Sequence, residues 1–333
     1  MNSNLLKTFV LLSAFICLNI FTYSADAQQT NSLIIFHAGS LSVPFKEMAK
    51  AFTAKNPGVQ IIREAAGSRT CARKIVDLGR PCDIIASADY TVIENILIPA
   101  YASWNISFAT NEMAIMYRTD SRDADRINTK NWYKILLQKG VEYGHSDPDT
   151  DPCGYRSQLV WQLAERYYHV PGLYEQLRKY CPPKNIRPKE TDLIALLEAG
   201  QIDYLFIYRS VCMQHKMPFV KLPEQINLGS SRYTSFYKQA SIRISGKTPH
   251  SFTVKRGMPM IYGITIPKNA PHKILAIRYV AFVLSKRGKQ IMKQNGQTPL
   301  IVPQVTGKAS QLPTELKRLV QRQKHGGISH ERF

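Results

Sequence analysis

Along the first part of the chain, short apolar runs alternate with segments that have the spacing of a helix. Residues 32–41 form a short apolar run that ends in small residues, which predicts a strand and a turn. Residues 43–56 then repeat apolar positions every three to four residues, as a helix does. The same order returns at 59–68 and 69–79, and 82–89 is a third apolar run. Strand, helix, strand, helix, strand predicts a parallel sheet with helices on its faces.

The alternation continues to residue 296. Strands are predicted at 108–118, 141–147, 203–210 and 258–268, and helices at 131–140, 155–168, 189–201 and 272–296, the last as a helix pair or one long helix. These elements predict two α/β lobes: residues 28–113 with 239–333, and residues 114–238. A cleft between two such lobes is a natural ligand site.

The first residues are predicted to be an export signal rather than part of the fold. Lys7 is followed by an apolar run at 9–20, and the sequence Ala25-Asp26-Ala27 is typical of a cleavage site after Ala27. An N-terminal membrane anchor is the alternative interpretation. We expect a periplasmic or otherwise exported protein, soluble or membrane-associated.

The net charge and the number of cysteines indicate which partners and which thiol state to expect. The 333 residues carry a formal net charge of +20, which favours approach by anions and by acidic membrane surfaces. The basic residues are scattered without a nucleic-acid motif, so we expect no nucleic-acid partner. Without Cys17 five cysteines remain, and this odd number leaves at least one free thiol in the expected monomer.

Small polar turns stand just before several predicted helices. They hold Ser40 in HAGSL, Ser68 in AAGSR, Cys153 in DPCGYRS and Thr191 in PKETDL. At the carboxyl ends of strands such turns gather hydroxyls and free backbone N–H groups, with helix dipoles behind them. Together they fit a small tetrahedral dianion without needing a lysine partner. Taken singly, each residue is also an ordinary helix cap.

These turns carry a resemblance to a known family. The stretches LIIFHAGSLSVPF, EAAGSRTCARKI, CDIIASADY, DPCGYRSQL, PKETDLIALLEAGQIDYLFIYRSV and IYGITIP resemble exported tungstate/molybdate-binding proteins that feed ABC importers. The resemblance runs from residue 33 to 296. It implies a type II periplasmic-binding-protein fold with two mixed-sheet lobes and a hinge, and a binding protein rather than an enzyme. It also implies molybdate or tungstate as ligand, no cofactor, and an ABC permease as partner.

The resemblance implies a role for each turn residue. Ser40 and Ser68 would provide hydroxyl and N–H donors from the first lobe, and Cys153 and Thr191 backbone N–H donors from the second. Tyr208 would donate its phenol hydrogen to one ligand oxygen, although it is also interpretable as a packed strand aromatic.

Asp151 would contact the metal centre of the oxyanion. Tungsten(VI) and molybdenum(VI) accept further oxygen ligands whereas sulfur and phosphorus do not, so a carboxylate would select against sulfate and phosphate. In one branch of the family a glutamate before the tyrosine adds a second carboxylate, but Ile207 stands there. We therefore expect four or five ligands rather than six. Asp151 is alternatively a helix N-terminal residue, and Asp147 and Asp149 are interpreted as loop residues.

Two other functions stay open from the sequence. A binder of sulfate or another non-metal oxyanion would share the fold. A cysteine hydrolase would use Cys153 at its helix N-terminus, but the only nearby histidine is His145, on the other side of the aspartate-rich loop.

Overall fold

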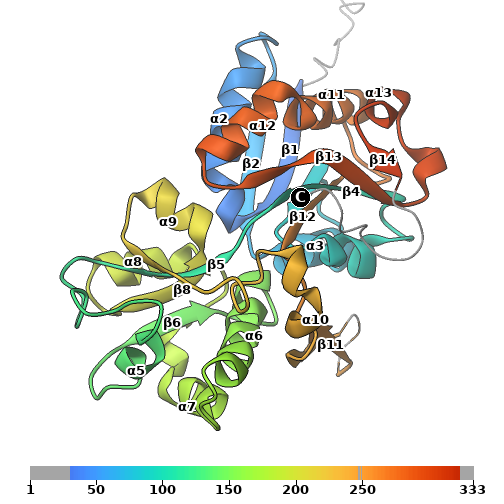
Figure 1. Cartoon of the computed structure of the whole chain (residues 1–333). Helices are drawn as coiled ribbons and strands as arrows, with labels where there is room; N and C mark the ends of the chain where they lie inside the picture. Colours follow the sequence, from blue (N-terminus) through green and yellow to red (C-terminus); the bar gives the residue numbers. More distant parts are fainter. Residues whose placement is uncertain (1–30, 247, 249, 323–333) are drawn as a thin grey trace, which may run out of the picture.

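The computed structural model describes residues 31–246, 248 and 250–322, and it forms two lobes, each built on one mixed sheet (Figure 1). The first lobe takes the blue, teal and red parts of the chain, and the second the green and yellow parts. The predicted signal at 1–27 lies outside the described residues. Among the described helices, none is both long and apolar enough to cross a membrane.

The sheet of the first lobe has seven strands in the order β14-β13-β4-β12-β3-β1-β2. Its strands are β1 (Ser32–Ala38), β2 (Gln60–Ala66), β3 (Ile84–Ser87), β4 (Trp104–Thr110), β12 (Ile261–Thr265), β13 (Thr298–Gly307) and β14 (Gln321–Arg322). Its helices are α2 (Ser42–Thr53), α3 (Ser68–Val76), α4 (Tyr90–Val92), α11 (Lys273–Leu284), α12 (Lys286–Gln294) and α13 (Thr314–Lys317). Strands β2, β1 and β3 are parallel, as predicted, whereas β12 runs antiparallel to β3 and to β4.

The sheet of the second lobe has five strands in the order β7-β6-β8-β5-β9. Its strands are β5 (Met113–Tyr117), β6 (Tyr143–Ser146), β7 (Ile186–Arg187), β8 (Tyr204–Tyr208) and β9 (Phe219–Lys221). The helices in this part of the chain are α5 (Trp132–Leu136), α6 (Pro152–Tyr167), α7 (Leu173–Tyr180), α8 (Asp192–Glu198), α9 (Arg209–His215) and α10 (Thr234–Tyr237). The core of this lobe is aromatic: Trp161 packs edge-on against Phe206, with ring centroids 5.4 Å apart.

The chain crosses between the lobes at a place where the sequence predicts one strand. Residues 108–118 are in fact the end of β4 and all of β5, which belong to different sheets. The break falls at Asn111, whose side-chain nitrogen donates to Ser210 Oγ at 2.7 Å and to Tyr262 OH at 2.8 Å. These bonds hold a polar side chain from the crossing segment between residues of both lobes. The lobe boundaries expected at 113/114 and 238/239 stay a prediction.

Two local features complete the fold: one decides between two predicted alternatives, and the other was not predicted. The segment 272–296 is a helix pair, divided at Ser285, whose hydroxyl caps α12 by accepting from the N–H of Gly288 at 3.3 Å. The hairpin of β10 (Ser241–Ser245) and β11 (Phe252–Arg256), which the sequence analysis did not predict, stands apart from both large sheets. It contacts the second lobe through Gln162 of α6, whose amide makes two 2.9 Å bonds with the Ser241 backbone.

Candidate functional site

The first lobe contributes two serine turns at the ends of parallel strands. Ser40 follows β1 and is fully buried, and its hydroxyl oxygen accepts from Tyr262 OH at 3.0 Å. Ser68 is the first residue of α3, and its hydroxyl oxygen accepts from the Ala88 N–H at 2.9 Å. In each case the bond uses a lone pair, so the hydroxyl hydrogen is available to donate.

The two lobes are in close contact at these turns. A Cβ atom added to Gly67 would lie 2.4 Å from the carbonyl oxygen of Thr150, in the loop before α6. A Cβ on Gly39 would lie 2.8 Å from both carboxylate oxygens of Glu190. Only glycine permits such an approach of backbone to neighbour. The serine turns of one lobe therefore face the acidic turns of the other in a closed arrangement.

Asp151 is a buried helix cap, held by two backbone N–H groups. It precedes α6, and its Oδ1 accepts from the Cys153 N–H at 3.1 Å. Its Oδ2 accepts from the Glu190 N–H at 2.9 Å. The alternative interpretation, a residue at the helix N-terminus, is therefore correct in geometry. The Cys153 N–H, expected to donate to a ligand, already donates to this carboxylate.

Glu190 is a second carboxylate that the sequence analysis missed. The side chain is 1 % exposed, and among the described residues neither of its oxygens has a hydrogen-bond partner of good geometry. The Ser40 backbone and the Asp151 carboxyl lie beside it, and burial followed by the Asp151 charge raises the pKa of Glu190 well above its usual value. Buried polar groups without a hydrogen-bond partner are rare in folded proteins, so the Glu190 carboxyl group marks a candidate ligand site.

The second carboxylate thus comes from position 190, and Ile207 lies in the strand core. Glu190 directly precedes Thr191 in PKETDL, where the sequence interpretation saw only the start of a helix. Thr191 itself is partly exposed before the short helix α8, and its side chain does not cap that helix. The signal available in the sequence was a glutamate in a strand-to-helix turn opposite a second acidic turn.

Tyr208 lies on the second-lobe side of the site. It ends β8 and is fully buried, and its phenol oxygen accepts from Arg156 Nη1 at 3.0 Å. Burial raises the pKa of Tyr208 well above its usual value, so the phenol stays protonated and able to donate. A buried cation therefore lies one hydrogen bond from the phenol, although the sequence analysis required no cationic side chain at the site.

The two groups that a cysteine hydrolase would use, Cys153 and His145, are both buried. The Cys153 thiol is fully buried, and this burial raises its pKa well above the usual value, so the thiolate is disfavoured. His145 directs Nδ1 to the Ser146 carbonyl oxygen at 2.6 Å, and burial lowers the pKa of its ring to about 4. In the described part of the chain all five cysteines are free thiols.

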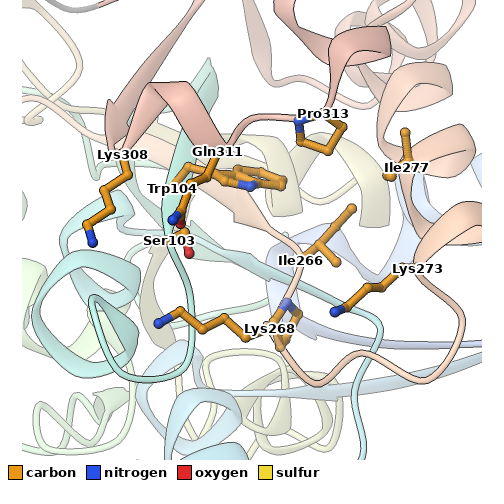
Figure 2. Close-up of a pocket in the computed structure, with 10 residues that line it drawn as sticks. Ser103, Trp104, Ile266, Lys268, Lys273, Ile277, Lys308, Gln311 and Pro313 are labelled. Carbon is orange, nitrogen blue, oxygen red and sulfur yellow. The ribbon is translucent and has the colours of Figure 1, made fainter.

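Several surface pockets lie away from these residues. One of about 390 Å³ on the first lobe has Trp104 and Ile266 in its lining, together with Lys268, Lys273 and Lys308 (Figure 2). No serine, carboxylate or phenol of the candidate site lines it. Within the described residues, no group of three or more His, Cys, Asp or Glu side chains could hold a metal ion. The polar groups of the candidate site are therefore two carboxyl groups, two hydroxyls and a phenol.

Comparisons with known proteins agree with this architecture. The family model for bacterial extracellular solute-binding proteins matches residues 33–298. An uncharacterized solute-binding protein of Petrotoga mobilis is 58% identical over 86% of this chain and 89% of its own length. The molybdate/tungstate-binding protein WtpA of Pyrococcus abyssi is 41% identical, over 88% and 91%.

Solved structures show the same fold. The periplasmic molybdate-binding protein of Azotobacter vinelandii aligns with a TM-score of 0.58 at 16% identity, over 80% of this chain and 98% of its own. The sulfate-binding protein SubI of Mycobacterium tuberculosis aligns with a TM-score of 0.57 at 14% identity, over 81% and 87%. The predicted two-lobe α/β fold with mixed sheets is confirmed, and the chain belongs to the bacterial extracellular solute-binding protein family.

Proposed function

We propose that this protein binds molybdate or tungstate between its lobes, outside the cytoplasm, and delivers it to an ABC importer. The observation that carries the proposal is Glu190, a buried carboxyl group next to Asp151 whose two oxygens have no hydrogen-bond partner among the described residues. The 41% identity to a molybdate/tungstate-binding protein supports the same ligand class.

The carboxylate pair argues against an ordinary tetrahedral anion. The Asp151 carboxylate, and Glu190 once it is ionised, would each repel a dianion by several kcal/mol at protein dielectric values, on the order of 4 kcal/mol per unit-charge pair at about 4 Å. A tungsten or molybdenum centre can offset this repulsion because it accepts carboxylate oxygens as ligands, whereas the sulfur of sulfate does not. With Glu190 beside Asp151, coordination by two carboxylates becomes possible, and the expectation of at most five ligands no longer follows from Ile207.

The other groups would bind the oxo atoms. Ser40 and Ser68 would donate from the first lobe and Tyr208 from the second, because each has a hydrogen that its own structural bond does not use. The fixed carboxylate of Asp151 would provide one metal ligand, and Glu190 the other after losing its proton.

Calorimetric titration with tungstate, molybdate and sulfate in parallel tests the proposal. Tight binding of tungstate or molybdate that a large excess of sulfate does not displace is expected. The melting temperature should also rise with tungstate, because the ligand binds only the folded form. Sulfate binding of equal strength, or no binding of either metal oxyanion, would contradict the proposal.

A further inference from the structure

Arg156 is a buried cation that joins the two lobes beside the site. It lies on α6 and is 4 % exposed. Its Nη1 donates to the carbonyl oxygen of Ala88, at the end of the first-lobe sheet, at 2.8 Å, and to the Tyr208 phenol of the second lobe at 3.0 Å. The N–H of the same Ala88 donates to Ser68 Oγ. One guanidinium thus connects a proposed ligand donor of each lobe.

The contact with Arg156 fixes where the phenol hydrogen can go. A guanidinium has donors only, so Tyr208 accepts from it with a lone pair and cannot donate back. Among the described residues, the phenol has no hydrogen-bond acceptor. Its hydrogen is therefore available to a ligand oxygen while the Arg156 bond is present. The guanidinium also lies near the ring, 5.7 Å from its centroid, which restrains the side chain.

A second buried group crosses the same interface. Asp89, at the end of β3, accepts from Lys255 of the β10–β11 hairpin at 3.1 Å and from the hydroxyl of Tyr155 of α6. Burial favours the neutral acid, but the charges of Lys255 and Arg156 outweigh it and hold the pKa of Asp89 well below its usual value. Asp89 is thus ionised, and it ties α6 and the hairpin to the first lobe.

We propose that Arg156 is a positioning residue that makes the Tyr208 donor depend on lobe closure. In the closed form Asp89 holds α6 against the first lobe through its hydrogen bond with Tyr155. This inference rests on the proposed oxyanion site. Parting the lobes removes Ala88 from Arg156 and Asp89 from Tyr155, which frees the guanidinium to leave the phenol. The aligned donor then exists only in the closed form, so it slows ligand release and contributes little to capture.

Stopped-flow kinetics with tungstate tests this coupling on the full protein. The set is wild type, Arg156→Lys, Tyr208→Phe, the double variant and the control Arg166→Lys, a change at an exposed position on the same helix. Both bonds come from one nitrogen, Nη1, whose two hydrogens are fixed in the guanidinium plane. Lysine keeps the charge, but its ammonium hydrogens rotate and are not held in these two directions. Release should become about tenfold faster in Arg156→Lys, with the capture rate within about twofold of wild type.

The double variant separates positioning from general weakening. Because Arg156 acts through Tyr208, the combined effect on release should be smaller than the product of the two single effects. Effects that multiply in full, or an Arg156→Lys release rate equal to that of the control, would overturn the inference. Failure of wild type to bind tungstate would instead refute the proposed function.

A second variant keeps the test decisive if Arg156→Lys does not fold, as melting curves without ligand would show. Tyr155→Phe removes one hydroxyl, the group that holds α6 to Asp89. It should speed release and again combine with Tyr208→Phe to less than the product. Release as slow as in wild type would overturn the proposed coupling.

Discussion

Replacing Glu190 with glutamine removes one ionisable carboxyl group from the site and keeps the shape of the side chain. Glu190 is buried against Asp151, and both causes raise its pKa from the ordinary value of 4.5. The ligand-free protein in its closed arrangement therefore holds a proton there at a pH where an exposed glutamate has lost it. Any ligand must bind either the protonated or the ionised form, and the two cases have opposite pH dependence.

The direction and the size of the pH dependence of ligand affinity follow from proton linkage. Coordination of tungsten needs the ionised carboxylate, so binding releases the proton, and tungstate affinity should rise with pH until the raised pKa of Glu190 is passed. The steepest slope is about tenfold per pH unit, or about 1.4 kcal/mol. Sulfate needs the neutral acid, so its weaker binding should decline with the same slope above that pKa. Glu190→Gln should abolish both slopes, weaken tungstate and strengthen sulfate.

Calorimetry in two buffers of different ionisation enthalpy measures the proton count directly. Tungstate should release up to one proton in wild type and in Glu198→Gln, a matched change at an exposed glutamate that ends α8, the helix that follows Glu190. It should release none through position 190 in Glu190→Gln. Proton uptake by wild type, or the same release in Glu190→Gln as in wild type, would refute coordination by this carboxylate.

Three further predictions test the donors, the closure and the thiols. Ser40→Ala, Ser68→Ala and Tyr208→Phe should each weaken tungstate binding by about 1–3 kcal/mol, since each removes a donor to a charged oxygen; unchanged affinity in all three would exclude them from the site. Gly67→Ala should weaken binding and leave the saturated protein expanded in small-angle scattering, because its Cβ would lie 2.4 Å from a backbone oxygen of the opposite lobe; normal compaction would contradict this. Unreduced chain that begins at residue 28 should give five titratable thiols when unfolded and slow reaction at Cys153 when native; fewer than five would reveal a disulfide.

The sequence predicts elements well where one period dominates and poorly where the chain changes lobes. Strand β1 and helix α2 follow directly from a short continuous apolar run and the period near 3.6 residues that comes after it. Residues 108–118 have a continuous strand pattern, yet β4 and β5 pair in different sheets. Local propensity contains no information on which sheet a strand joins, because long-range pairing decides it. The polar Asn111–Glu112 pair inside the run was the available sign of a crossing.

The site shows the same division between local and long-range information. Asp151 was identified because the local stretch DPCGYRS resembles the known family, and its alternative role as a helix N-terminal residue is also a local pattern. Glu190 was missed because a carboxylate becomes exceptional only when folding buries it without a partner, 39 residues along the chain from Asp151. Arg156 was missed for a similar reason, since its role depends on Ala88 from the other lobe.

The distribution of charge separates attraction from selection. A net charge of +20 over the chain raises the local concentration of any anion, sulfate included, and so favours capture without choosing the ligand. Under the proposed function, the buried pair of Asp151 and Glu190 would act after entry and would oppose every dianion that cannot accept a carboxylate as a ligand. Selectivity for a metal oxyanion therefore should survive high salt, which screens the surface charges but hardly reaches buried groups. Measured against ionic strength, the capture rate of tungstate should fall while the ratio of tungstate to sulfate affinity stays the same, and a ratio that falls with the capture rate would place selection at the surface instead.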